Sequence, residues 1–330
     1  MRVYLATAYK QGIALRHLKN AARLDRFHVH EIAGSPDQAD VILFVENGEL
    51  DDPFYTKLLR HPFVTEERER TFMYNEWDYP WCVLPGLYVG MPRRSFDAQR
   101  QASFCYLFTP NEFIADFARS RTVPDLLFSF AGARNHRLRK RVLALSDPRA
   151  HVEDTHAFSI WRSHEPEEVL KLKRIYAEVL GRSKFVLCPR GAGTSSFRLF
   201  ETLEAGRVPV IISDQWVPSE GPDWSFAVRV PESAIASIPD TLRNLESEAH
   251  DRGRAARAAW EEWFAPDVTF HRAVELLVAL RQRGATRRRV RDQLPDLEHL
   301  RMRTKLALRN NRRAGRDFLL RLLRGKQSAN

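Results

Sequence analysis

The apolar positions of the chain alternate between short continuous runs and helical spacings from the first residues onward. Residues 2–7 and the run ADVILFV at 39–45 predict buried strands, and apolar residues at 13, 15, 18 and 24 predict a helix between them. A strand, a helix and another strand in succession are typical of a parallel sheet. The same patterns predict further strands at 27–32, 125–130, 151–160, 184–188, 208–212 and 226–230, and helices at 51–61, 111–119, 136–145, 166–180, 235–247, 255–264 and 269–283.

The most informative stretch runs from 183 to 214 and predicts a strand, a glycine-containing loop, a helix, a turn and a strand. Gly191 and Gly193 let the main chain approach a ligand closely, and Ser195 and Ser196 are candidate N-cap residues. A helix that begins directly after such a loop presents free N–H groups and its positive dipole end, which favour a phosphate or diphosphate. The same turn also occurs in α/β proteins where it binds nothing.

Charged residues beside this loop strengthen the anion hypothesis. Arg190 enters the loop and Arg198 lies in the first helical turn, so both guanidinium groups are predicted to reach one anion. Glu201 is placed to accept hydrogen bonds from sugar hydroxyls, or else to pair with Arg198 on the helix surface. Asp214, which ends the next strand, either contacts the ligand or caps a turn.

The segment CPRGAGTSSFRLFETLEAGRVPVIISDQWVPSEGPDWSFAVRVPE, at 188–232, resembles the donor-binding segment of exostosin-like glycosyltransferases. The shared elements are CPRG, a serine, Arg-Leu-x-Glu, VPVI-I-x-D and a tryptophan-containing strand that ends in Pro-Glu. The resemblance covers about 125–245 well and the N-terminal part loosely. It implies a GT-B architecture, in which two Rossmann-like domains face a cleft, with C-terminal helices here. It also implies a nucleotide-diphosphate donor, most simply a UDP-sugar, inversion at the anomeric carbon and no obligatory metal.

Length and resemblance together predict three parts of the chain. With 330 residues, two domains are expected: an acceptor-side domain at 1–122 and a nucleotide-sugar-binding domain at 123–275, followed by a basic helical tail at 276–330. The strand at 125–130 resembles the start of the family's donor domain. Gly132 would approach the diphosphate and Arg134 would neutralise it, the alternative being a simple turn with a solvated arginine.

An inverting transfer needs a general base, and the resemblance places it in the first domain, across the cleft from the donor. The candidates are Glu46, Glu76 and Asp78, with Glu76 the first choice, although no spacing rule selects one. The aromatic residues around 77–88 either bind an acceptor saccharide or form core. The leaving diphosphate would be stabilised by helix amides and arginines in place of a metal.

The cysteines and histidines predict neither a cofactor nor a metal. Three scattered cysteines form no disulfide framework, and the 11 histidines show no metal-ligand spacing. No signal-peptide pattern and no apolar run of membrane-spanning length is visible. These features predict a bacterial-type, cytoplasmic member of the family whose only required small molecule is its donor.

The net charge of +10 belongs to the tail. Residues 281–330 hold 16 Lys or Arg and 4 Asp or Glu, whereas the rest of the chain holds 36 and 38. Three interpretations stay open: a solvated helix packed on the body, a basic amphipathic helix on the inner face of an anionic membrane, or an RNA-binding segment, which is disfavoured because it lacks aromatic interleaving. The expected acceptor is a glycan, free or lipid-linked, of a surface or exopolysaccharide. The alternative function is a non-catalytic membrane- or RNA-associated binding protein that keeps the fold.

Overall fold

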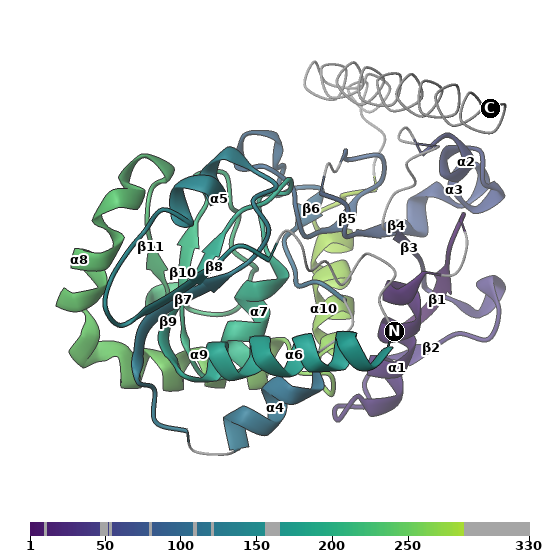
Figure 1. The fold of residues 1–330 in the computed structure, drawn as a ribbon. Helices are drawn as coiled ribbons and strands as arrows, with labels where there is room; N and C mark the ends of the chain where they lie inside the picture. The colour runs from purple at the N-terminus through teal and green to yellow at the C-terminus, as the bar shows by residue number, and fades with distance from the viewer. Residues whose placement is uncertain are drawn as a thin grey trace, which may run out of the picture.

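The computed structural model describes residues 1–9, 12–46, 52, 55–78, 81–107, 111–119, 122–155 and 166–286. Within these ranges the chain forms two parallel β-sheets that stand beside each other with helices around them (Figure 1). The tail from 287 onward, on which the membrane and RNA interpretations depend, lies outside the described residues. In the described ranges, no helix combines the length and the apolar character that crossing a membrane requires.

The first sheet is built from residues 2–102 and has the strand order β2-β1-β3-β4-β5-β6. Its strands are β1 (Arg2–Ala6), β2 (Glu31–Ile32), β3 (Val41–Glu46), β4 (Thr71–Asn75), β5 (Gly86–Tyr88) and β6 (Gln101–Ala102). All neighbouring strands are parallel, as the alternating pattern predicts. Strand β2 is shorter than the predicted 27–32, because His28 adopts a positive φ of 53° that breaks the extended run.

The second sheet is built from residues 126–229 and has the strand order β11-β10-β9-β7-β8. Its strands are β7 (Leu126–Ala131), β8 (Ala150–Glu153), β9 (Ser183–Pro189), β10 (Val208–Ile212) and β11 (Val228–Arg229). These strands are also parallel, so the loops that follow them meet at one edge of the sheet. The loop of Gly191 and Gly193 lies at this edge, after β9.

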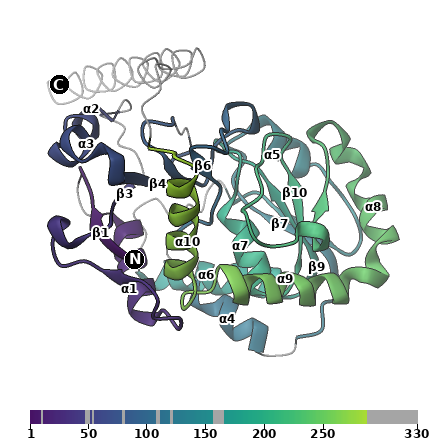
Figure 2. The same cartoon turned by 180° about the vertical axis from the view of Figure 1, so that it is seen from behind.

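Helices cover the faces of both sheets and one of them joins the two halves. They are α1 (Ile13–Leu24), α2 (Thr56–Leu59), α3 (Pro62–Glu66), α4 (Glu112–Arg119), α5 (Arg137–Val142), α6 (Pro166–Gly181), α7 (Phe197–Glu204), α8 (Ile238–Asn244), α9 (Ala249–Trp263) and α10 (Thr269–Gln282). Figure 2 shows α10 between the two sheets, and it contacts α1, β5 and β6 of the first half. The last described helix therefore returns to the N-terminal sheet.

One hydrophobic cluster extends through both halves. It contains buried side chains from β1, β3 and β4 together with side chains from α7, β9, α9 and α10. Phe104 packs on Phe264 with ring centroids 5.8 Å apart, and Tyr106 packs edge-on against Phe200 at 6.3 Å. The predicted apolar face of α6 is only partly buried: Ile175 is exposed, and the buried residues of the helix are Ala177, Leu180 and Gly181 near its end.

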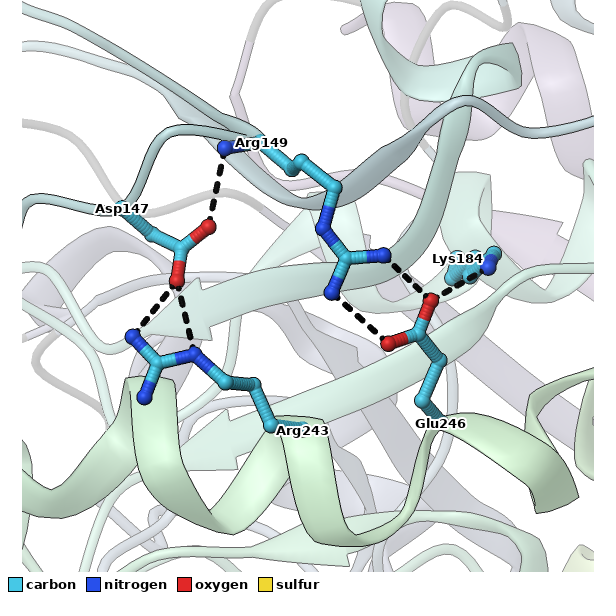
Figure 3. Close-up of polar contacts among 5 residues, drawn as sticks. All are labelled: Asp147, Arg149, Lys184, Arg243 and Glu246. Carbon is cyan, nitrogen blue, oxygen red and sulfur yellow. Dashed lines mark hydrogen bonds and ion pairs between the residues drawn. The ribbon is translucent and has the colours of Figure 1, made fainter.

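Ion pairs at the amino edge of the second sheet hold α8 and the following turn in place (Figure 3). The Glu246 carboxylate accepts hydrogen bonds from Arg149 at 2.7 and 2.8 Å and from Lys184 at 2.5 Å. Asp147 accepts from Arg243 at 2.8 Å and from the Arg149 N–H at 2.8 Å. The donations of Arg149 and Lys184 lower the pKa of Glu246 to about 2. This network lies at the sheet edge opposite the glycine loop.

Candidate active site

The glycine loop between β9 and α7 is fixed by contacts from the first half of the chain. Thr194 Oγ1 donates a hydrogen bond to the Gly90 carbonyl at 3.0 Å. The Asp78 carboxylate accepts a hydrogen bond from the Gly193 N–H, and a Cβ added at Gly193 would lie 2.7 Å from Asp78 Oδ1. Only glycine allows this close approach. The loop is therefore one of the places where the two halves meet through polar groups.

Three arginines, which we call the arginine cluster, surround the base of the loop: Arg139, Arg190 and Arg198. Arg139 Nε and Nη2 donate to the carbonyls of Arg190 and Pro189 at 3.3 and 3.4 Å. The guanidinium groups of Arg139 and Arg198 both lie over the Phe130 ring, 5.9 and 4.8 Å from its centroid. Burial and the neighbouring Arg198 lower the pKa of Arg139 to about 10. Cations gathered in this way favour an anion between them.

Arg139 was not predicted as a site residue, and Arg198 makes other contacts than those predicted. Arg198 is 5% exposed, and its Nη2 donates to the Ala131 carbonyl at 2.5 Å. Its guanidinium therefore links the end of β7 to α7, whereas the prediction had it reach one anion together with Arg190. Arg190 lies near Glu232, with 3.7 Å between Nη1 and Oε1. The two predicted arginines thus share the anion region with a third cation and do not form a clamp by themselves.

Several buried polar atoms around the loop have no hydrogen-bond partner in the described part of the chain. They are Ser196 Oγ, Arg190 Nε and Arg198 Nε. Ser196 is the N-cap residue of α7, as predicted, but within the described ranges its side chain caps no backbone N–H. Ser195 is also buried. Unpaired donors beside a cationic cluster are what a site for an oxygen-rich anion needs.

The other predicted donor-side residues have partners within the protein. Gly132 lies against Arg198, whose Nη2 would be 3.0 Å from an added Cβ, so it makes room for the guanidinium. Arg134 pairs with Asp154 at 2.9 Å, and its side chain is 58% exposed. This exposed pair agrees with the alternative of a solvated arginine and gives no support to a role at the diphosphate.

Glu201 and Asp214, for which alternatives stayed open, also bind protein groups. The Tyr176 hydroxyl donates to Glu201 Oε2 at 2.7 Å, and burial raises the pKa of Glu201. In place of the alternative surface pair with Arg198, Glu201 makes a partly buried contact with Tyr176. Asp214 Oδ1 accepts from the Glu232 N–H at 3.0 Å and so caps a turn. Asp214 and Glu232 also line a cavity of about 430 Å³ with Arg137, Leu138, Arg141 and Ser233.

Of the three candidate bases, only Asp78 reaches the glycine loop. Glu46 is buried and accepts hydrogen bonds from the Ala8 N–H at 2.6 Å and from Thr7 Oγ1 at 3.2 Å, so it holds the loop after β1. Glu76, the first choice from sequence, is also buried and accepts from the Leu107 N–H, and burial raises its pKa to about 7. Its carboxyl group is therefore bound to the backbone of its own half.

Asp78 is an exposed residue whose carboxylate group is nevertheless desolvated. The residue as a whole is exposed, but its carboxylate points inward against the buried Gly193. Burial raises the pKa of Asp78, whereas the Gly193 N–H, Arg139 and Arg190 act in the opposite direction. A carboxylate of raised pKa next to an anion site has the properties of a general base.

Residues 115–245 of the chain match the Exostosin GT47 domain. The resemblance to exostosins is confirmed. An Exostosin-1 homolog of Caenorhabditis elegans is 50% identical over 70 residues, and Exostosin-1 of Drosophila melanogaster is 37% identical over 93 residues. These alignments cover 20% and 27% of this chain, and 18% and 12% of the relatives, so the chain matches less than a fifth of either relative.

Solved glycosyltransferases align with a larger share of the chain, but at a much lower sequence identity. A glycosyltransferase from Rickettsia africae aligns over 84% of this chain and 98% of its own, with 9% identity and a TM-score of 0.40. Anabaena HepE, solved in complex with UDP, aligns over 84% of this chain and 100% of its own, with 10% identity and a TM-score of 0.38. The α/β architecture of two parallel sheets agrees with the predicted fold class.

Proposed function

We propose that the protein transfers a sugar from a nucleotide-diphosphate donor, most simply a UDP-sugar, to a glycan acceptor with inversion at the anomeric carbon. The observation that carries the proposal is the arginine cluster around the glycine loop, with unpaired donors of Ser196, Arg190 and Arg198 beside it. A leaving diphosphate gains negative charge as the glycosidic bond breaks, and fixed cations and helix amides stabilise that charge. The exostosin match of the same segment supports this assignment.

In the proposed reaction, the acceptor hydroxyl oxygen attacks the anomeric carbon from the side opposite the diphosphate. The bond between that carbon and the β-phosphate oxygen breaks, and its electron pair stays on the diphosphate. The diphosphate would displace the Asp78 carboxylate from the Gly193 N–H, and the released carboxylate would accept the hydroxyl proton, since Asp78 is the candidate base nearest the loop. The diphosphate would lie against Arg139, Arg190 and the α7 amides. No metal-bound step is part of the proposal.

The donor can be tested before the acceptor is known. Purified protein is screened by thermal shift against UDP, GDP, ADP, CDP and the corresponding monophosphates, since a ligand that binds the folded state raises Tm. We expect a diphosphate to give the largest shift and UDP to exceed the other bases. Hydrolysis of the matching nucleotide sugar should then continue unchanged when Mg²⁺ or Mn²⁺ is added or omitted. Equal shifts for monophosphates and diphosphates would contradict the diphosphate site.

The cellular location and the acceptor are proposed from the charge of the tail. The basic segment 276–330 would attach a cytoplasmic enzyme to the inner face of an anionic membrane, close to a lipid-linked glycan. We expect the protein to sediment with vesicles that contain anionic lipid at low salt, and not with neutral vesicles. Equal recovery with both vesicle types would contradict the attachment.

A further inference from the structure

A group of histidine and carboxylate side chains lies at the amino edge of the first sheet, away from the glycine loop. His30 precedes β2, and His271 and Glu275 lie one turn apart on α10. The three potential ligand atoms lie within 4.8 Å of one another. We propose that His30, His271 and Glu275 bind a divalent metal ion, Zn²⁺ before others, which links the N-terminal sheet to α10.

The chemistry of the donor set favours zinc. Two imidazoles and one carboxylate are ordinary zinc ligands, with a fourth position left for water, whereas Mg²⁺ and Ca²⁺ prefer oxygen ligands only. The spacing of His271 and Glu275 places both on the same face of α10.

Two buried polar atoms beside these side chains lack hydrogen-bond partners among the described residues, which favours binding of a cation there. His271 Nδ1 and Asp25 Oδ1 are buried without a hydrogen-bond partner among the described residues. Asp25 is only 1% exposed, and its charge acts on His271. A buried carboxylate oxygen without a partner is costly, and a nearby divalent cation would offset that cost. The arrangement thus supplies negative charge beside the three ligands.

The geometry needs a small adjustment to hold the ion. His30 Nε2 and Glu275 Oε1 are 2.7 Å apart, and the His30 and His271 rings stack with centroids 5.1 Å apart. Tetrahedral zinc with bonds of about 2.0 to 2.1 Å requires ligand atoms about 3.3 Å apart, with the metal in each ring plane. Rotation of the His271 ring about its Cβ–Cγ bond would turn a nitrogen toward the other two ligands. Glu275 is half-exposed and can follow.

Zinc binding by the untagged, full-length protein tests the site. After chelator treatment and desalting, Zn²⁺ is titrated in competition with a chromophoric chelator, and Co²⁺ is used as a visible-absorption probe of tetrahedral coordination. We expect one equivalent of bound metal. Binding should be at least tenfold weaker in both His30→Gln and His271→Gln, and unchanged in His250→Gln, which alters an exposed histidine of α9. Saturating Mg²⁺ should not displace the zinc.

Two further measurements separate this site from a merely structural stack. Glu275→Gln changes a half-exposed side chain and should fold normally, yet we expect it to weaken zinc binding and reduce the Co²⁺ absorption. Zinc should raise the Tm of the wild type but not of His271→Gln, while the UDP affinity stays the same in both, because the donor site is at the opposite edge. Wild-type zinc affinity in the His30 and His271 variants, or no stoichiometric binding at all, would overturn the proposal.

Discussion

The Asp78 carboxylate accepts a hydrogen bond from the Gly193 N–H, so a side chain of the first half of the chain contacts the glycine loop of the second half. This carboxylate is itself an anion placed among Arg139, Arg190 and the loop amides. It lies where the proposed diphosphate would also be attracted. Donor binding and the position of Asp78 are therefore coupled.

Replacement of Asp78 by asparagine should separate binding from catalysis. Removal of the competing negative charge should lower the Kd for UDP severalfold, while loss of the base should reduce kcat by about 10²- to 10⁴-fold. Isothermal titration and steady-state kinetics measure the two effects, and Glu69→Gln, an exposed acid of the same half, serves as the control. Weaker UDP binding in Asp78→Asn would contradict the competition between the two anions.

Replacement of Arg139 by alanine should weaken the donor site without unfolding the protein. Loss of one fixed cation at the diphosphate should raise the Kd for UDP at least tenfold and lower kcat by about 10²- to 10³-fold, the range found when one transition-state donor is removed. Lys140→Ala, an exposed neighbour on α5, should leave both constants unchanged. Equal effects of the two substitutions would show that α5 contributes only general charge.

Glu76→Gln distinguishes a structural acid from the catalytic base. A folded-state pKa of about 7, above the usual value of 4.5, means that the contribution of Glu76 to stability is complete below about pH 4.5 and is lost as the pH rises through 7. The glutamine variant should lose this fall in the free energy of unfolding, measured by urea titration between pH 4.5 and 8. It should also keep its kcat within about tenfold of the wild type, because a general base contributes 10² to 10⁴. A larger loss would restore Glu76 as the base.

Glu246→Gln tests the ion network of Figure 3. Because its folded pKa of about 2 lies below the unfolded value, Glu246 stabilises the fold above about pH 4.5, and this contribution is lost as the pH falls toward 2. The variant should lose about 1 kcal/mol of unfolding free energy at pH 7, as partly exposed ion pairs do. The two proteins should converge as the pH is lowered, whereas Glu178→Gln on α6 should match the wild type throughout. A constant difference at every pH would argue against the charge as its cause.

Local patterns were sufficient for the strands β1, β3, β7, β9 and β10, the glycine loop and the start of α7, because each is encoded within a few neighbouring residues. The strands β4, β5 and β6 of the first sheet were not predicted. Arg139 could not be found in this way, since it precedes Arg190 by 51 positions and only the pairing of β7 with β9 brings the two together. His30 and Glu275 are 245 positions apart, and therefore no ligand spacing appears in the sequence. The sequence did not distinguish Glu76 from Asp78 as a candidate base. Only the fold shows that the Glu76 carboxylate is bound by the Leu107 N–H of its own half, whereas that of Asp78 reaches the glycine loop.

The hydrophobic cluster that runs from β1 through Phe104 and Phe264 into α9 has a consequence for how the protein melts. Separation of the halves would expose these rings to water, so each half shares part of its hydrophobic interior with the other. The chain should therefore unfold in one cooperative transition. The exostosin-matching segment 115–245, expressed by itself, should aggregate or stay unstructured.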